Sequence, residues 1–190
     1  AGILSAWVGS VLVMLVTGGL VQLGYDLFQF YVPIHGHSLG LSASAIGGVL
    51  ATLAVAVFVV RTFLARLVEK YPGEKLLAWV FFTGAAGFAL MPFAGNAWVL
   101  GAIAFGFGLG MGIGIPLTVI LMYANSAEGR SGQTLGLRLT VNNFVRMSGP
   151  MAFGAIGAAV GVSGVFWLLA GFFAAIGAYQ RNAVLILIGM

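Results

Sequence analysis

VLATLAVAVFVV, residues 49–60, is apolar on nearly every face and decides the fold class. A transmembrane β-strand would be a run of about ten residues that alternates between apolar and polar side chains. This run instead continues without alternation through residues 43–68, which is the pattern of a membrane-spanning helix. We therefore expect an all-α membrane protein.

The composition of the whole chain agrees with a lipid environment. Of its 190 residues, 61% are hydrophobic and 6% are charged, and the mean hydropathy is +1.11. A soluble domain has about a quarter of its residues charged, so this chain has too few charges to cover a water-exposed surface. The net charge of +4 does not indicate nucleic acid, because the basic residues form no patch with interleaved aromatic side chains.

Six long apolar runs are present, and about 20 apolar residues are enough to cross the hydrocarbon core. Between the runs lie glycine, proline, serine and asparagine, which are typical of turns. We expect one bundle of six transmembrane helices over residues 1–190, with no room for a separate soluble domain. The runs are about 3–30, 43–68, 76–91, 98–123, 135–160 and 165–179.

Lys and Arg gather at alternate connections between the runs. Bases surround the second and fourth connections and follow the sixth run, whereas the first, third and fifth connections have none. Because basic residues stay on the cytoplasmic side, this pattern predicts that both chain ends are cytoplasmic. The bases that follow the pattern are Arg61, Arg66, Lys70, Lys75, Arg130, Arg138 and Arg181.

Arg146 is the base outside that pattern. It follows Arg138 by eight positions, which places it about 12 Å deeper in a hydrocarbon core about 30 Å thick. A charge there costs at least about 2.5 kcal/mol, so it normally faces a bundle interior or a wet cavity and has a partner. Asn142 and Asn143 precede Arg146 at helical contact spacings. We interpret the three as cavity or substrate-binding residues; the alternative is that Arg146 pairs with a carbonyl or an acid only for packing.

The first run has a polar stripe on one face, at spacings of i, i+3, i+4 and i+7. Asp26 is the only acid outside the basic loops. In a helix that continues to Pro33, it could bind a proton or pair with Arg146; in a helix that stops at Gly24, it lies in water. The stripe consists of Gln22, Tyr25, Asp26 and Gln29.

His35 and His37 follow in the next predicted connection. A His-x-His pair can bind a metal or respond to pH. A third ligand is missing, so we expect a solvated loop and no metal site.

The fourth run is unusually rich in glycine. Glycines spaced by four residues permit close contact between helices, and Pro116 after them favours some flexibility. Tight packing is our main interpretation, and a moving gate is the alternative. A phosphate loop is excluded because no Lys-Ser or Lys-Thr follows and no strand precedes. The packing residues are Gly106, Gly108, Gly110, Gly112 and Pro116, with Gly149 and Pro150 in the fifth run.

No enzyme constellation is visible. The spans hold no pair of acids, and the sequence has no HExxH motif. With no cysteine, the chain has no disulfide, thiolate metal site or catalytic thiol. We expect no enzymatic activity and no cofactor.

The second connection reads ARLVEKYPGEK at residues 65–75. It resembles the loop motif G-x-x-x-[DE]-[RK]-x-G-x-[RK]-[RK] of the major facilitator superfamily of secondary transporters, with Glu69 and Lys70 as the acid and base that latch one bundle against the other. The polar loop around Arg130, the Gly149-Pro150 pair and the glycine-rich turn at residues 161–164 are similar to the same family.

The resemblance covers almost the whole chain, yet it covers one six-helix half of a transporter that normally has twelve helices. The fourth run lacks the buried Arg usual in the first half, so the chain resembles a C-terminal half. By analogy the first, second, fourth and fifth spans face the cavity or the other half. The third and sixth spans, which are the least polar, would lie outside against lipid.

The resemblance implies half of a secondary active transporter in a bacterial inner membrane. It would move a small organic solute, anionic or aromatic, by alternating access with a second six-helix bundle, coupled to protons. That bundle would be another half or a second copy of this chain. The alternative is a structural or assembly subunit of a larger membrane complex that transports nothing.

Overall fold

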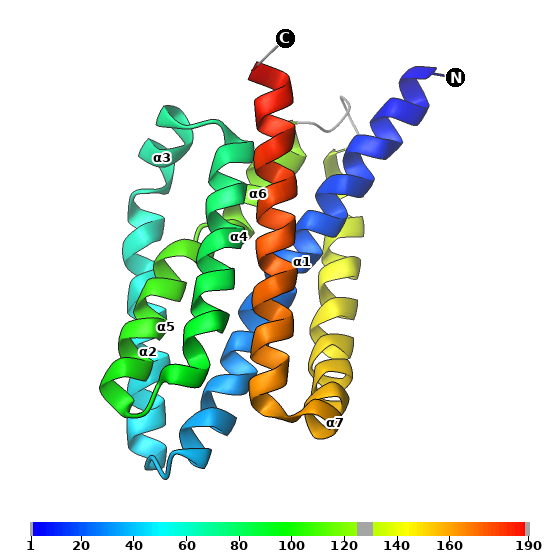
Figure 1. Cartoon of the computed structure of the whole chain (residues 1–190). Helices are drawn as coiled ribbons and strands as arrows, with labels where there is room; N and C mark the ends of the chain where they lie inside the picture. Colours follow the sequence, from blue (N-terminus) through cyan, green and yellow to red (C-terminus); the bar gives the residue numbers. More distant parts are fainter. Residues whose placement is uncertain (1, 125–130, 189–190) are drawn as a thin grey trace.

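The computed structural model describes residues 2–124 and 131–188, with side chains over 12–124 and 132–181. Within these ranges the chain is helical and contains no strand, which confirms the all-α fold (Figure 1). The helices are α1 (Gly2–Ser38), α2 (Ala43–Thr62), α3 (Leu64–Lys70), α4 (Gly73–Leu90), the short 3₁₀ helix η1 (Met91–Phe93), α5 (Ala97–Met111), α6 (Gly114–Ala124) and α7 (Ser131–Ile188).

α7 is 58 residues long but crosses the bundle twice. At Gly161 the backbone turns to φ 79° and ψ 159°, a conformation open to glycine because it has no Cβ. The first limb, 131–160, and the second limb, 162–188, therefore run in opposite directions (Figure 1). Four other segments are long and apolar enough to span a membrane: 12–38, 43–62, 73–93 and 97–124. The total is six passes, as expected for half of a major facilitator bundle.

α1 is longer than the sequence predicts, because it continues through Pro33 to Ser38. A proline inside a helix costs about 3 kcal/mol. Tyr31 and Val32 beside it are fully buried, and each such side chain contributes about 1.5–3 kcal/mol, which offsets that cost. The alternative in which the helix stops at Gly24 is wrong, and Asp26 lies inside the helix.

The histidine pair also lies in α1 and not in a loop. His35 is half-buried, with Nε2 3.3 Å from the carbonyl oxygen of Ala94, whereas His37 is exposed. The described residues contain no group of three or more possible metal ligands. The expected solvated loop is therefore wrong for His35, which packs on the segment after η1.

The fourth span is broken into α5 and α6 at residues 112–113. Pro116 has no N–H to donate to the carbonyl oxygen of Gly112 four residues earlier. The guanidinium of Arg61, in the last turn of α2, fills this place by donating from Nε to that oxygen at 3.1 Å. The span expected to be one helix is thus interrupted just before Pro116, and the free carbonyl oxygen is capped from the neighbouring helix.

The glycines of the fourth span bring helices together unequally. Gly108 and Gly112 face α2, and Gly110 faces the Thr83 side chain of α4. Gly149 contacts Leu23 of α1. Gly106 has open space around it, so its predicted packing role is wrong: it points out of the bundle from the exposed side of α5.

An aromatic core joins the helices at the centre. The rings of Phe28 and Phe107 are stacked with centroids 3.8 Å apart, and they tie α1 to α5. Phe81 of α4 lies 5.6 Å from Phe173 of the second limb of α7. α1 also runs along the first limb of α7, and α2 runs along α5.

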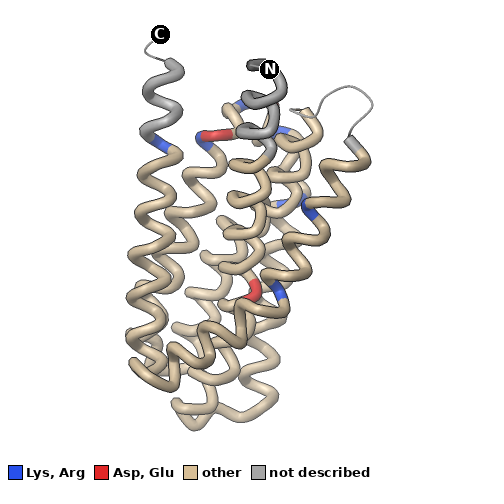
Figure 2. Tube along the Cα trace, turned by 90° about the vertical axis from the view of Figure 1, so that its right-hand side faces the viewer, with Lys and Arg blue, Asp and Glu red and all other residues tan. Residues whose placement is uncertain are grey.

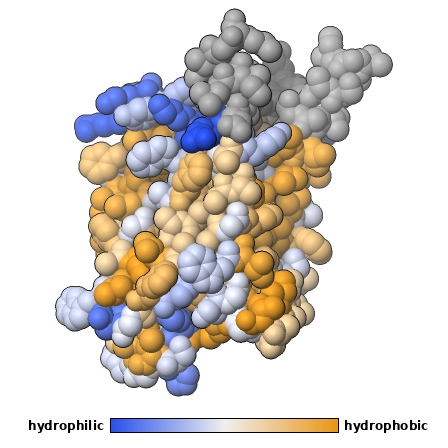
Figure 3. Space-filling view, in the orientation of Figure 1, coloured by the Kyte–Doolittle hydropathy of each residue, from blue (hydrophilic) through white to orange (hydrophobic). Residues whose placement is uncertain are grey.

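Charged residues concentrate at one end of the bundle, the end that holds α3 and the start of α4 (Figure 2). The space-filling view shows the same end as the most hydrophilic part, above a largely apolar surface (Figure 3). The described part of the chain is therefore asymmetric along the membrane normal, as the distribution of bases predicts.

Candidate functional site

Side chains of α1 and of the first limb of α7 form a ladder along their contact. Gly18 lies against Arg138, and Asp26 forms an ion pair with Arg146, so the two parallel helices share one register over two helical turns. Spacings of four residues place each set on one helix face. We call this set the polar seam; it consists of Gly18, Gln22 and Asp26 of α1 and Arg138, Asn142 and Arg146 of α7.

The ion pair lies near the middle of the membrane-spanning part. Arg146 is about 22 Å of helix from either end of the first limb. Among the described residues it is the one ion pair. The predicted pairing of the two oppositely charged residues therefore exists, with Asp26 buried and Arg146 on the surface of the bundle.

The geometry leaves the guanidinium with free donors. Arg146 Nε is 3.7 Å from Asp26 Oδ2, too long for a hydrogen bond. The Arg146 side chain is 66% exposed, whereas the Asp26 side chain is 9% exposed. Gln22 holds the carboxylate by donating from Nε2 to both oxygens, at 3.0 and 2.9 Å. The acid is thus fixed and the base is free to bind something else.

Arg138 is buried, although the sequence pattern assigns it to the charged end. Its Nη2 donates to the carbonyl oxygen of Ile115 and to the hydroxyl of Thr118, both at 3.2 Å. Its Nε has no partner among the described residues, and neither has Oδ1 of Asn142 one turn further on. A buried polar atom left without a hydrogen bond costs about 1–3 kcal/mol, so these two atoms are the least satisfied part of the polar seam.

The remaining predicted residues are not brought to the same place. Tyr25 is half-buried, and Gln29 and Asn143 are exposed. Sequence reasoning missed the polar pair next to the seam: Gln180 Nε2 lies 3.5 Å from Thr17 Oγ1, and both side chains are buried. The eight-residue spacing from Arg138 to Arg146 was the signal that could have added Arg138.

The predicted latch residues lie at the charged end. Glu69 and Lys70 end α3 and are exposed. Lys70 Nζ lies 5.5 Å from the centre of the Tyr71 ring, and Glu69 forms no ion pair within the described part of the chain. Their latch role stays a prediction.

Comparison with family profiles matches residues 9–188 to the Major Facilitator Superfamily. The chain belongs to this superfamily. Neither the curated proteins nor the solved structures gave a match. Membership in the major facilitator superfamily makes the chain an integral membrane protein with a transporter role, and it confirms the resemblance found in the loop at residues 65–75.

Proposed function

We propose that the chain is half of a secondary active transporter that moves a small organic anion by alternating access with a second six-helix bundle. The second bundle is either the other half of the transporter or a second copy of this chain. One observation carries the proposal: Arg146 lies about halfway along its membrane-spanning limb and is 66% exposed on the surface of the bundle. Alternating access between two bundles around a midplane site is the mechanism that such an arrangement serves.

A guanidinium at that depth needs a polar neighbourhood. Charged side chains inside a membrane face a bundle interior or a water-filled cavity, because contact with lipid costs at least about 2.5 kcal/mol. The ion pair with Asp26, at 3.7 Å, leaves most of the Arg146 donors free. A second bundle that encloses a water-filled cavity over this face would provide hydrogen-bond acceptors for these donors.

The charges of the seam favour an anionic solute. The seam contains two guanidinium groups, Arg138 and Arg146, and one carboxylate, Asp26, so it has one positive charge in excess. An arginine binds a carboxylate or phosphate through two parallel hydrogen bonds. Asp26 is also the proposed proton site. A proton on it would release Arg146 to bind the solute, and this would couple proton movement to solute movement.

The basic end of the bundle gives the proposed orientation. Arg66, Lys70 and Lys75 lie with the ends of α1 and α7 at that end. Under the positive-inside rule this end is cytoplasmic, in a bacterial inner membrane. Glu69 and Lys70 would then latch the second bundle, while α4 and the second limb of α7, which pack on each other, would lie outermost.

Cysteine accessibility tests the cavity without knowledge of the solute, because the natural chain has no cysteine. Thiols react with water-soluble maleimides as thiolates, which form in water and not in lipid. We expect Asn143→Cys, beside the seam, to react in native membranes. Phe172→Cys, on an exposed apolar face of the second limb of α7, is the matched control and should stay unreactive; Glu69→Cys should react fully.

The outcome also separates the second candidate, a structural or assembly subunit. In that case unrelated subunits cover the seam and no water reaches it. A cysteine at position 143 that is as inert as the one at position 172 would contradict the transporter proposal.

A further inference from the structure

A cavity of about 490 Å³ opens between α3, α4 and α5 at the charged end of the bundle, away from the polar seam. Sites for small ligands have about 300–1,000 Å³. Lys75 and Tyr71 line one end of the cavity, and Trp79, Thr83, Leu109 and Gly110 line the rest. Its wall is therefore polar at one end and apolar beyond it.

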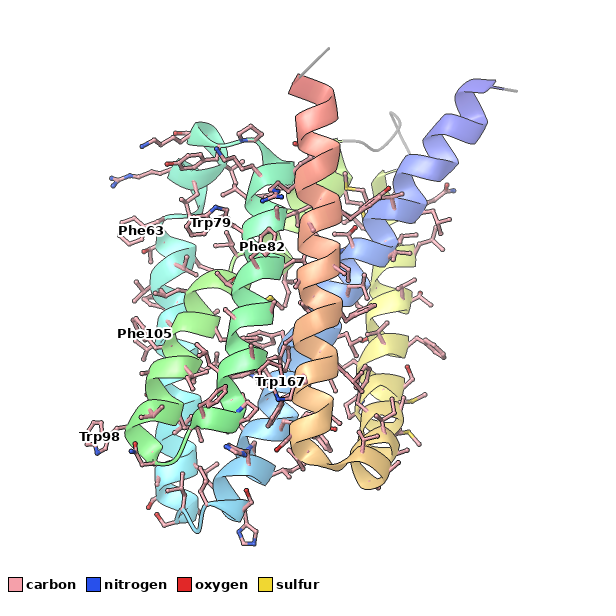
Figure 4. The ribbon with its side chains drawn as sticks, viewed as in Figure 1. Phe63, Trp79, Phe82, Trp98, Phe105 and Trp167 are labelled. Atoms are coloured by element: carbon pink, nitrogen blue, oxygen red, sulfur yellow. The ribbon has the colours of Figure 1, made fainter. Side chains whose placement is uncertain are left out.

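The cavity follows one face of α4 into the membrane. Lys75, Trp79 and Thr83 are spaced by four residues, so the cavity descends about 12 Å from the first to the last. The Thr83 hydroxyl donates to the carbonyl oxygen of Trp79 at 2.9 Å, and its side chain packs on Gly110. Its hydrogen is therefore already used within the helix and is not needed by a polar ligand. Trp79 is 66% exposed and lies on the side of α4 that faces α3 (Figure 4). The deep part thus suits a hydrocarbon chain.

The mouth of the cavity is cationic. Lys75 and Tyr71 line this end of the cavity, and the ammonium groups of Lys70 and Lys75 lie 5.5 and 5.8 Å from the centre of the Tyr71 ring, so Lys70 lies close to the entrance as well. Neither forms an ion pair with any described residue. Residues 61–75 hold four bases and two acids, and the acids, Glu69 and Glu74, do not line the cavity. The entrance therefore has free positive charge at the level where lipid phosphates lie.

We propose that this cavity binds an anionic phospholipid. Its phosphate pairs with Lys70 and Lys75, and one acyl chain lies along Trp79, Thr83 and Leu109. Basic pockets between membrane helices recognise anionic headgroups, and tryptophan is favoured at the boundary between headgroups and hydrocarbon. A soluble anion could use the charges but would leave the apolar wall uncovered, so the observations favour a lipid.

Quenching of Trp79 by brominated lipids tests the proposal. The full chain with Trp7, Trp98 and Trp167 replaced by Phe is reconstituted in vesicles that contain a tenth of brominated phosphatidylglycerol or brominated phosphatidylcholine. We expect the anionic lipid to quench Trp79 several-fold more strongly. Lys70→Gln with Lys75→Gln should abolish the difference, whereas Lys70→Arg with Lys75→Arg should keep it, as should Arg181→Gln, at a base that does not line the cavity.

A protein that retains only Trp98, which is 89% exposed at the opposite end of the bundle, is the matched control and should be quenched equally by both lipids. Equal quenching of Trp79 by the two lipids would overturn the proposal. So would a preference that survives the double glutamine variant, or one that soluble glycerol 3-phosphate removes, since the site would then bind a free phosphate.

Discussion

Two helix–helix contacts occupy corresponding places in this bundle but differ in chemistry. When the chain is divided into two three-span repeats, as in major facilitator bundles, the first and fourth spans correspond, as do the second and fifth. The contact between α1 and the first limb of α7 therefore corresponds to the contact between α5 and α2. The two helices of each contact run parallel (Figure 1). The first contact is the polar seam. The second, which we call the glycine seam, consists of Leu53, Ala56, Val57, Gly108 and Gly112.

The difference shows that corresponding helix–helix contacts of the bundle can serve either close packing or ligand recognition. At the glycine seam a Cβ on Gly108 would lie 2.8 Å from the carbonyl oxygen of Leu53, so the two helices are in close contact there. At the polar seam charged and amide side chains lie along the contact, and Arg146 extends to the surface. Close packing makes the first seam rigid, while the second keeps free donors for a ligand.

Gly108→Leu should have the largest effect, because it breaks the glycine seam. The new side chain would meet Leu53 and Ala56 and force α2 away from α5, and overpacking of this kind costs about 1–3 kcal/mol or more. We expect loss of the folded monomer in detergent, measured by size-exclusion chromatography and thermal unfolding. Gly106→Leu, two residues away in open space, is the matched control. Equal stability of the two variants would show that the seam is not tightly packed.

Arg146→Ala should break the polar seam in function but not in folding. The side chain is 66% exposed, so its loss removes little packing. We expect uptake of labelled organic anions into proteoliposomes made from membranes that contain the chain to fall at least about tenfold, equivalent to about 1.4 kcal/mol. Arg146→Lys should retain part of the flux, and Arg181→Ala should retain all of it. Unchanged flux in Arg146→Ala would remove this residue from the transport site.

The fold could be predicted from the sequence because each membrane-spanning helix needs about 20 apolar residues. Such runs are visible directly in the sequence. The positions of the six passes follow from them. The ends of helices could not be predicted as well, since they depend on neighbours: α1 passes Pro33 because Tyr31 and Val32 are buried by other helices. The sequence around Pro33 contains no sign of those neighbours.

The candidate site could be predicted in part. Asp26 and Arg146 were recognised because a charge within an apolar run is costly and needs a partner. Arg138 was assigned to the charged end, since the tilt and depth of a helix end cannot be derived from spacing alone. Gln180 and Thr17 were missed because they are far apart in the chain, and a single uncharged polar residue within a span gives no signal.

Arg61→Leu should weaken the glycine seam at the break between α5 and α6. It removes the donor to the Gly112 carbonyl oxygen, which costs about 1–3 kcal/mol. In a Pro116→Ala background the new backbone N–H can donate to that oxygen, so the cost should fall by about 1 kcal/mol in a double-mutant cycle of unfolding in detergent. Arg66→Leu on exposed α3 is the control. Additive effects of Arg61→Leu and Pro116→Ala would mean that the arginine does not replace the missing donor.

Tyr31→Phe should have the smallest effect and would sharpen the comparison at the far end of the α1–α7 contact. The Tyr31 hydroxyl donates to the carbonyl oxygen of Phe153 at 2.6 Å, and the side chain is buried. Loss of this one bond should lower the free energy of unfolding by about 1 kcal/mol, whereas Tyr179→Phe, at a side chain 70% exposed, should not change it. If the two variants unfold alike, the hydroxyl contributes nothing, and α1 is held to α7 by the polar seam and by apolar packing alone.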